Sequence, residues 1–154
     1  MIIREAKMED WKEVKRLRGL LVQYEKEKLG NELLDINWID SKEIEESTKN
    51  YIKEQYCFVA VEDERIVGII TGKISPERSW IIEKTGILNN LYVEEKYRGK
   101  GIATKLYERF CVEIKKEGIA KIELHTMTNN KNAIKFYERL GFKSYNLQML
   151  NKQI

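Results

Sequence analysis

A short basic stretch with two glycines, YRGKGIA at residues 97–103, has the residue types needed to hold a phosphate. Gly99 and Gly101 lack the Cβ atoms that would keep a phosphate away from the backbone. The apolar spacing that follows predicts a helix, whose first N–H groups lack partners within the helix and carry partial positive charge. Arg98 and Lys100 add cationic side chains. The stretch is suited to phosphate binding, although a plain turn between a strand and a helix would have a similar sequence.

Two common nucleotide-binding motifs do not fit this spacing. A P-loop requires a glycine where this chain has Glu94, and a serine or threonine where it has Gly101. The dinucleotide motif GxGxxG requires glycine or alanine at the position of Thr104. The glycine turn therefore belongs to neither class.

Hydrophobic periodicity and turn residues predict the elements around this turn. Strands are expected within residues 2–5, 56–63, 66–75, 80–93, 119–127 and 142–150. Helices are expected within residues 8–29, 40–54, 102–117 and 129–142. In the third long strand, Gly86 or the Asn89-Asn90 pair is expected to form a bulge. The order β-α-α-β-β-β-α-β-α-β predicts one α/β (α+β) domain over residues 1–154, with a mixed sheet.

Two segments together resemble the GNAT superfamily of acetyl-coenzyme A-dependent N-acetyltransferases. Residues 98–103 match its [Arg/Gln]-x-x-Gly-x-[Gly/Ala] signature, and residues 91–108 resemble the strand, loop and helix that carry it. Residues 130–142 resemble the family's next helix, in the form Asn-x-x-Ala-x-x-Phe-Tyr-x-x-x-Gly-Phe. The resemblance implies the GNAT fold, with a mixed, mostly antiparallel sheet whose fourth and fifth strands (residues 80–93 and 119–127) splay apart.

The resemblance also implies acetyl-CoA as cosubstrate, lying in the gap between the splayed strands. Main-chain groups of Leu91, Tyr92 and Val93 would pair with the amides of its pantetheine arm, as an added strand would. Its pyrophosphate would lie against the backbone N–H groups of the glycine turn and the helix start. Those residues are Arg98, Gly99, Lys100, Gly101, Ile102, Ala103 and Thr104. Asn130 matches an asparagine that often bonds the cofactor or nearby water, and it could equally cap the next helix.

The implied reaction is direct transfer of an acetyl group to an amine. Tyr137 matches the tyrosine that often protonates the leaving sulfur, next to the cofactor. Its reference pKa of about 10, against about 8.5 for a thiol, keeps it protonated and able to donate. An aromatic residue at this helical spacing could instead serve only the core. A backbone N–H of Leu91 or Tyr92 would stabilise the oxyanion.

The general base is where the sequence departs from the family pattern. Many relatives carry Glu or Asp just before the LYV stretch, whereas this chain has Asn89 and Asn90, whose amides do not accept a proton at neutral pH. Asn90 could orient a water that carries the proton away, and Glu83 is a candidate base. His125 has a suitable intrinsic pKa, although a structural role is more common for such a residue. The missing carboxylate leaves a non-catalytic acetyl-CoA binding or sensing module as the alternative.

Charge is unevenly distributed along the chain. Residues 96–121 carry eight basic and three acidic residues, and residues 21–54 carry nine acidic and five basic residues. In this family the helices after the first strand form the acceptor side, so the acidic segment is compatible with a cationic amine acceptor. It is also compatible with an ordinary solvated surface.

Composition excludes several other classes of protein. The chain of 154 residues is 42% hydrophobic and 34% charged, as expected for a folded soluble domain, and it has no membrane-length apolar run. A net charge of +3 without a matching motif argues against nucleic-acid binding, and a single histidine argues against a metal site. Cys57 and Cys111 lie in apolar stretches, which favours reduced thiols in the cytoplasm. The apolar residues 146–150 could serve a homodimer interface.

Overall fold

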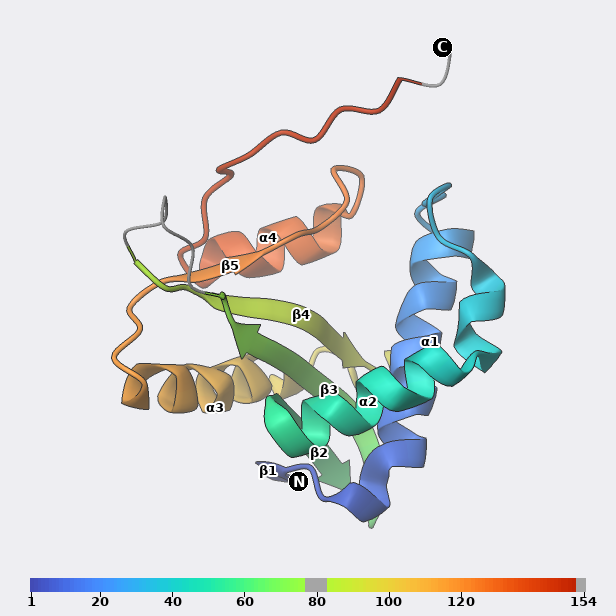
Figure 1. The fold of residues 1–154 in the computed structure, drawn as a ribbon, viewed down its shortest axis with the longest axis vertical. Coiled ribbons are helices and arrows are strands. Elements are labelled where there is room, and N and C mark those ends of the chain that lie inside the picture. Colours follow the sequence, from blue (N-terminus) through green and yellow to red (C-terminus); the bar gives the residue numbers. More distant parts are fainter. Residues whose placement is uncertain (77–82, 152–154) are drawn as a thin grey trace.

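The computed structural model describes residues 1–76 and 83–151 (Figure 1). The strands are β1 (Ile2–Glu5), β2 (Tyr56–Glu62), β3 (Arg65–Ile74), β4 (Gly86–Val93) and β5 (Ile122–Leu124). The α-helices are α1 (Trp11–Glu27), α2 (Lys42–Glu54), α3 (Ile102–Lys116) and α4 (Lys131–Arg139). Short 3-10 helices are η1 (Met8–Asp10), η2 (Ile36–Asp40) and η3 (Glu95–Tyr97). No helix within the described residues is long and apolar enough to cross a membrane.

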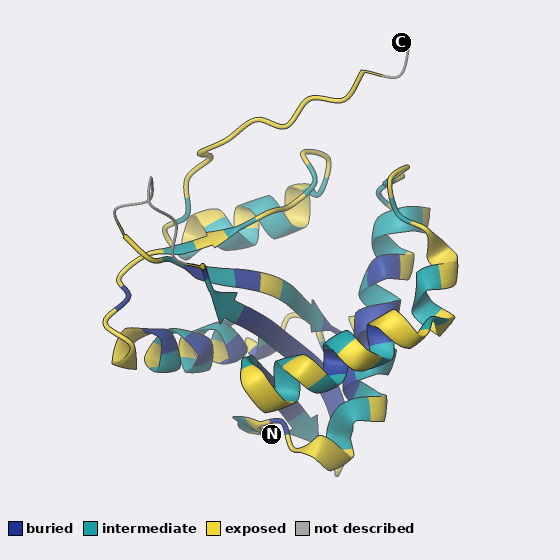
Figure 2. Cartoon of the chain, in the orientation of Figure 1, coloured by how far each residue is buried: buried dark blue, intermediate teal, exposed yellow. Residues whose placement is uncertain are grey.

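The strands form one sheet in the order β1-β2-β3-β4-β5, antiparallel throughout except for the parallel pair β4–β5. Helix α3 packs on one face of the sheet, and α1 and α2 pack on the other. Figure 2 shows buried residues concentrated in the central strands and on the inward sides of α1 and α3. The expected fold class, an α/β (α+β) fold with a mixed, mostly antiparallel sheet, is confirmed.

The apolar run of β2 follows from this arrangement, because both of its faces are covered. Phe58 and Ala60 belong to the core beneath α3, whereas Cys57 and Val59 belong to the core beneath α1. Alternate side chains of a strand point to opposite faces, so a strand between two helical layers has apolar residues throughout. Helix α3 contributes a stripe of buried residues at the expected spacing: Ile102, Leu106, Phe110 and Ile114.

Gly72 lies where the Phe110 ring of α3 packs closely against β3. A Cβ added there would come within 2.5 Å of Phe110 Cζ and 2.6 Å of the Ile87 carbonyl oxygen. Because one of these atoms belongs to the backbone, the strand itself would have to shift. We therefore expect Gly72→Ala to lower the free energy of unfolding by about 2–3 kcal/mol, as overpacked core positions do, measured by urea denaturation.

Gly68, on the same strand, is the matched control. Its added Cβ would have nearest contacts of 3.3 Å, so Gly68→Ala is expected to cost less than Gly72→Ala. A loss in Gly72→Ala no larger than that in Gly68→Ala would contradict the close packing of α3 on β3.

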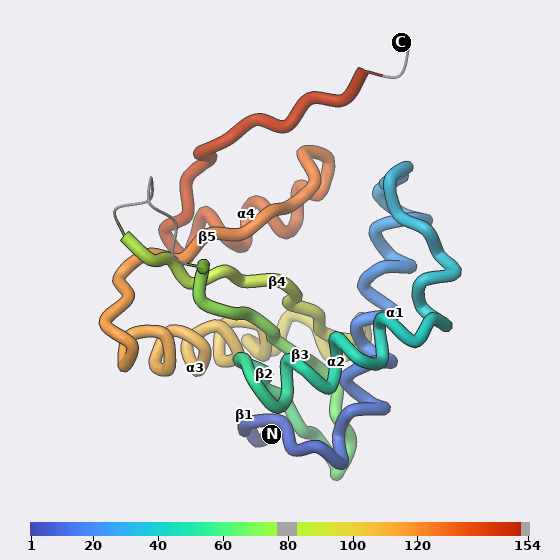
Figure 3. The backbone as a smooth tube through the Cα atoms, viewed as in Figure 1, coloured from blue at the N-terminus to red at the C-terminus, as the bar shows by residue number. Residues whose placement is uncertain are grey.

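The C-terminal segment differs from the sequence prediction. Residues 142–150 were expected to form a final strand, but they form no strand in the structure, and Figure 3 shows the segment leading away from the sheet. Tyr145 is 93% exposed and Met149 84%. The alternating apolar pattern predicts a strand, but a strand also requires a neighbour to pair with, and this segment has none within the described residues.

Candidate active site

The parallel pair β4–β5 opens after three residue pairs. The paired residues run from Gly86 opposite Ile122 to Leu88 opposite Leu124. From Asn90 to Val93, β4 pairs only with β3 in the part of the chain that the structure describes. The two elements separate at this point (Figure 1). The edge of β4 that faces β5 is therefore unpaired in residues 89–93, a stretch that includes the three residues predicted to pair with the pantetheine arm.

A β-bulge lies at the start of this free edge. Thr71 lies opposite Asn90 and Gly72 opposite Leu88, which leaves Asn89 as the additional residue in β4. The side-chain amide of Asn90 donates a hydrogen bond of 2.6 Å to Thr71 Oγ1. Of the two positions predicted for a bulge, Gly86 and the asparagine pair, the structure has it at the asparagine pair, and the Asn90 side chain is held against β3.

Both glycines of the turn between β4 and α3 have left-handed backbone conformations. The φ angle is 78° at Gly99 and 75° at Gly101. Gly101 is the N-cap of α3 and supplies no side-chain cap, so the first N–H groups of the helix, at Ile102, Ala103 and Thr104, are open to a ligand. A Cβ built on either glycine would have no heavy atom within 4 Å, so the space in front of the turn is open.

A cavity of about 330 Å³ lies over this turn. It is lined by Val93, Tyr97, Arg98, Gly99, Gly101, Ile102, Ala103, Thr104, Phe136 and Arg139. Six of the seven residues predicted to hold the pyrophosphate, all but Lys100, therefore share one cavity. The open turn, the uncapped helix start and the cavity together fit a phosphate-bearing group.

Helix α4 contributes two residues to this cavity that the sequence analysis did not single out, Phe136 and Arg139. Their spacing of three residues puts them on the same side of the helix, which is the signal that could have found them. Arg139 adds an exposed guanidinium to the lining of this cavity, where it can pair with a phosphate.

Arg98 is engaged with the protein on several sides. Its Nε donates a hydrogen bond of 2.9 Å to the Val93 carbonyl, and its guanidinium lies 5.6 Å from the centre of the Tyr24 ring and 5.5 Å from that of Tyr92. Such cation–π contacts attach the glycine turn to α1 and β4. The Lys100 ammonium lies 5.4 Å from the centre of the Tyr97 ring.

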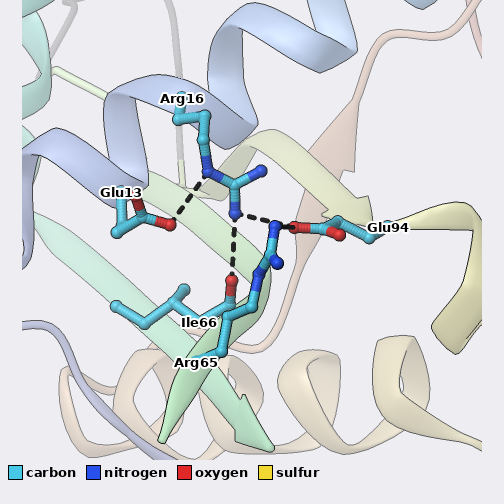
Figure 4. A network of polar contacts seen from close by, with 5 residues as sticks. All are labelled: Glu13, Arg16, Arg65, Ile66 and Glu94. Carbon is cyan, nitrogen blue, oxygen red and sulfur yellow. Dashed lines mark hydrogen bonds and ion pairs between the residues drawn. The ribbon is translucent and has the colours of Figure 1, made fainter.

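A buried carboxylate anchors the end of β4 just before the glycine turn (Figure 4). Glu94 accepts hydrogen bonds of 2.7 Å from Arg16 and 3.4 Å from Arg65. Arg16 also donates to Glu13 at 2.9 Å and to the Ile66 carbonyl at 3.2 Å. This network ties α1, β3 and β4 together at the position from which the turn begins.

Tyr137 lies on α4 in a cluster of aromatic rings. The ring centre is 5.2 Å from that of Phe136 and 5.5 Å from that of Phe142, both in edge contacts. Burial, together with the charge of Glu25, raises the pKa of Tyr137 to about 12. The phenol is therefore protonated across the neutral pH range and can act as a proton donor.

Glu25 is a carboxylate whose charge affects Tyr137, and the sequence indicated it only as one of the nine acidic residues of the segment 21–54. Glu25 lies near the end of α1, is half-buried, and has its pKa raised by that burial. The turn before α4 meets the chain just beyond α1, where Asn129 Nδ2 donates a hydrogen bond of 2.7 Å to the Leu29 carbonyl. These contacts join parts of the chain about 100 residues apart, so no local pattern in the sequence could reveal them.

The remaining candidate residues lie in different surroundings. Asn130 Oδ1 accepts a hydrogen bond of 3.3 Å from the Ala133 N–H, which confirms its capping role. Glu83 lies before β4 rather than within it, is exposed, and pairs with Lys121 at 2.5 Å. His125 follows β5 and is exposed. The structure does not bring Glu83 to the free edge of β4 or to the glycine turn, because it precedes β4 by three residues and its charge is paired at the surface.

The chain matches the model of the acetyltransferase (GNAT) family over residues 18–142. It is 32% identical over 120 residues to N-alpha-acetyltransferase 30 of Schizosaccharomyces pombe, covering 73% of this chain and 79% of that protein. N-alpha-acetyltransferase MAK3 of Arabidopsis thaliana is 34% identical over 92 residues, covering 60% of this chain and 47% of that protein.

Solved structures agree with this match. The BH1408 protein of Bacillus halodurans, a tetramutant, has a TM-score of 0.83 and 26% identity, covering 99% of this chain and 100% of that one. A protein of Clostridium acetobutylicum described as a predicted acetyltransferase, with acetyl-CoA, has a TM-score of 0.74 and 24% identity, covering 97% of this chain and 95% of that one. The chain is therefore an enzyme of the acetyltransferase (GNAT) family.

Proposed function

We propose that this enzyme transfers an acetyl group from acetyl-CoA directly to a primary amine of a peptide or small molecule, with both substrates bound at once. The observation that carries the proposal is the free edge of β4 leading into the open glycine turn, with Tyr137 on the neighbouring helix. An unpaired strand edge ending at a helix N-terminus suits a ligand that has amide groups at one end and phosphates at the other.

Each part of the site has a defined task in this proposal. Main-chain groups of Leu91, Tyr92 and Val93 bind the pantetheine amides, and the N–H groups of residues 98–104 hold the pyrophosphate. Bound acetyl-CoA supplies the thioester, and an N–H of Leu91 or Tyr92 donates to the carbonyl oxygen as negative charge develops on it. Tyr137 Oη donates a proton to the departing sulfur. Asn130, beyond its role as helix cap, would help to order water near the cofactor.

The acceptor approaches from the side of α1 and α2. Exposed carboxylates on this side favour a protonated, cationic amine over a neutral or anionic one; they are Glu32, Asp35, Asp40, Glu43 and Glu46. Two of the relatives are named N-alpha-acetyltransferases, which supports the α-amine of a peptide as the first acceptor to test.

Two assays test this function in sequence. Acetyl-CoA at a large excess over its Kd should raise the melting temperature of the protein, because it binds the folded state alone. A screen for free-thiol release across peptide α-amines, lysine side chains, polyamines and neutral amines should then find an acceptor. Binding without thiol release for any amine would favour the non-catalytic alternative, for which the asparagine pair at the bulge is the motivating observation.

The reagent that detects free thiol in this screen can also react with the two cysteines of the protein, and the structure predicts how fast each one reacts. Cys57 is 2% exposed, and burial raises the pKa of its thiol to about 12. The reactive thiolate is then scarce, so Cys57 is expected to react only after unfolding. Native protein should consume at most one equivalent of reagent, at Cys111, and denatured protein two. Two fast equivalents from the native protein would contradict the buried position of Cys57.

A further inference from the structure

We propose that Glu25 is the general base of the reaction and takes a proton from the ammonium group of the acceptor. The inference rests on the proposed transfer to an amine and adds a catalytic residue to it. It also names the protonated amine as the form of acceptor that the site receives.

The bulge of β4 does not supply a base. Neither Asn89 nor Asn90 can accept a proton at neutral pH, and the amide of Asn90 already donates to Thr71 at 2.6 Å. Since a protonated amine has no lone pair with which to attack, a proton acceptor has to come from another element facing the same space.

The end of α1 faces this space because contacts on two sides hold it there. The ring of Tyr24 packs against the Arg98 guanidinium of the glycine turn, at 5.6 Å. Just past the helix, the Leu29 carbonyl accepts from Asn129 in the turn that leads into α4. Glu25 lies between these two contacts in the sequence.

Glu25 itself has the features of a residue that acts on a ligand. It is half-buried, and no side chain within residues 1–76 and 83–151 donates a hydrogen bond or pairs with its carboxylate. The negative charge of Glu25 contributes to the raised pKa of Tyr137, on α4. In the proposal the Glu25 carboxylate is the proton acceptor and the Tyr137 phenol is the proton donor.

Other carboxylates considered for this role are occupied or remote. Glu83 is exposed and paired with Lys121. Glu94 is bound by two arginines. Glu27, on the same turn of α1, is exposed and accepts a hydrogen bond of 2.9 Å from Gln23.

The acceptor ammonium loses one proton to the Glu25 carboxylate, which later releases it to solvent. The freed nitrogen lone pair forms the new C–N bond, and the electron pair of the C–S bond leaves with sulfur. Tyr137 Oη–H protonates the sulfur, and a second proton from the attacking nitrogen returns to the tyrosinate. One amide, one thiol and one solvent proton result.

Burial of Glu25 has opposite consequences for chemistry and for folding. A raised pKa makes the carboxylate a better proton acceptor near neutral pH. For folding, the native state binds this proton more tightly than the unfolded state does. The contribution of Glu25 to stability is thus present below its unfolded pKa and is lost as the pH rises through the folded value. Glu25→Gln, which cannot ionise, should therefore not lower stability at neutral pH.

The test compares Glu25→Gln with Glu27→Gln in the full chain, using acetyl-CoA and a peptide that has a free α-amine. At pH 7, Glu25→Gln should lower kcat/KM at least about tenfold, the lower part of the range for losing an acid–base group. The defect should shrink above about pH 8, where the α-amine is already neutral. Glu27→Gln should behave as wild type, and urea denaturation should show both variants to be folded.

Three results would overturn the inference: unchanged kcat/KM in Glu25→Gln, a defect of equal size at pH 7 and pH 9, or an equal defect in Glu27→Gln. A higher KM with unchanged kcat would also overturn it, since that result makes Glu25 a binding residue. Failure of the proposed function is a different observation, namely that wild-type protein releases no thiol with any amine.

A second readout does not depend on turnover. With carboxyl carbons labelled, NMR titration of the free protein should give Glu25 a pKa above the usual value for a glutamate, because the side chain is half-buried. A Glu25 pKa at or below the usual value would contradict the buried setting on which the proton transfer rests.

Discussion

Replacing Tyr137 with phenylalanine is expected to lower kcat about 100-fold, within the range for loss of a general acid, while acetyl-CoA affinity stays unchanged. The hydroxyl is the only group removed, and its pKa of about 12 keeps it protonated at the pH of the assay. The ring keeps its edge contacts with Phe136 and Phe142, so the fold and the cavity wall should persist. Steady-state kinetics and a binding titration with acetyl-CoA separate the two effects.

Tyr107→Phe is the matched control. Tyr107 lies in the same aromatic cluster, with its ring centre 5.8 Å from that of Phe142, and the proposed mechanism gives its hydroxyl no role. Turnover should be unchanged in this variant. If Tyr137→Phe also turned over at the wild-type rate, the tyrosine would serve the core alone.

Gly101→Ala is expected to weaken acetyl-CoA binding at least about tenfold, or about 1.4 kcal/mol. The φ angle of 75° is strained for alanine, and the added methyl group points into space that is empty of protein atoms within 4 Å. In our account that space holds the pyrophosphate, so the methyl group would displace the ligand rather than the protein. Isothermal titration with acetyl-CoA measures the loss directly.

Gly118→Ala is the control that separates the effect of backbone strain from the effect of blocking the ligand site. Gly118 has a φ angle of 73° and likewise no heavy atom within 4 Å of an added Cβ, but it lies past the other end of α3. Both variants should lose about 1–2 kcal/mol of stability from the left-handed backbone, and only Gly101→Ala should lose affinity. Equal affinities for acetyl-CoA in the two variants would contradict the proposal that the pyrophosphate binds at the glycine turn.

Much of the fold could be predicted because its signals are local. The stripe of α3, the alternation in the central strands and the Ser41 cap of α2, which accepts from the Ile44 N–H at 3.3 Å, each depend on residues close in sequence. The bulge at Asn89 was also predicted. The prediction of a last strand was wrong. A strand needs a pairing partner elsewhere in the chain, and the alternating pattern of residues 142–150 does not show whether one is present.

Those parts of the candidate site that consist of residues adjacent in the sequence could be predicted. Those parts that form where distant elements meet could not. The glycine turn follows from one continuous stretch, whereas the free edge of β4 was implied by the resemblance to the GNAT superfamily. The Tyr24 ring beside Arg98 and the effect of the Glu25 charge on Tyr137 depend on where the end of α1 lies relative to the glycine turn and α4. Glu83 was proposed from its place in the sequence, but the strand begins only at Gly86.

The most direct test of the account is a stoichiometric transfer experiment with wild-type protein, acetyl-CoA and a peptide that has a free α-amine. We predict that free thiol and N-acetylated peptide form in equal amounts, measured by thiol reagent and mass spectrometry, and that neither forms when the amine is blocked. A protein that binds acetyl-CoA yet releases no thiol in response to any amine would contradict the account.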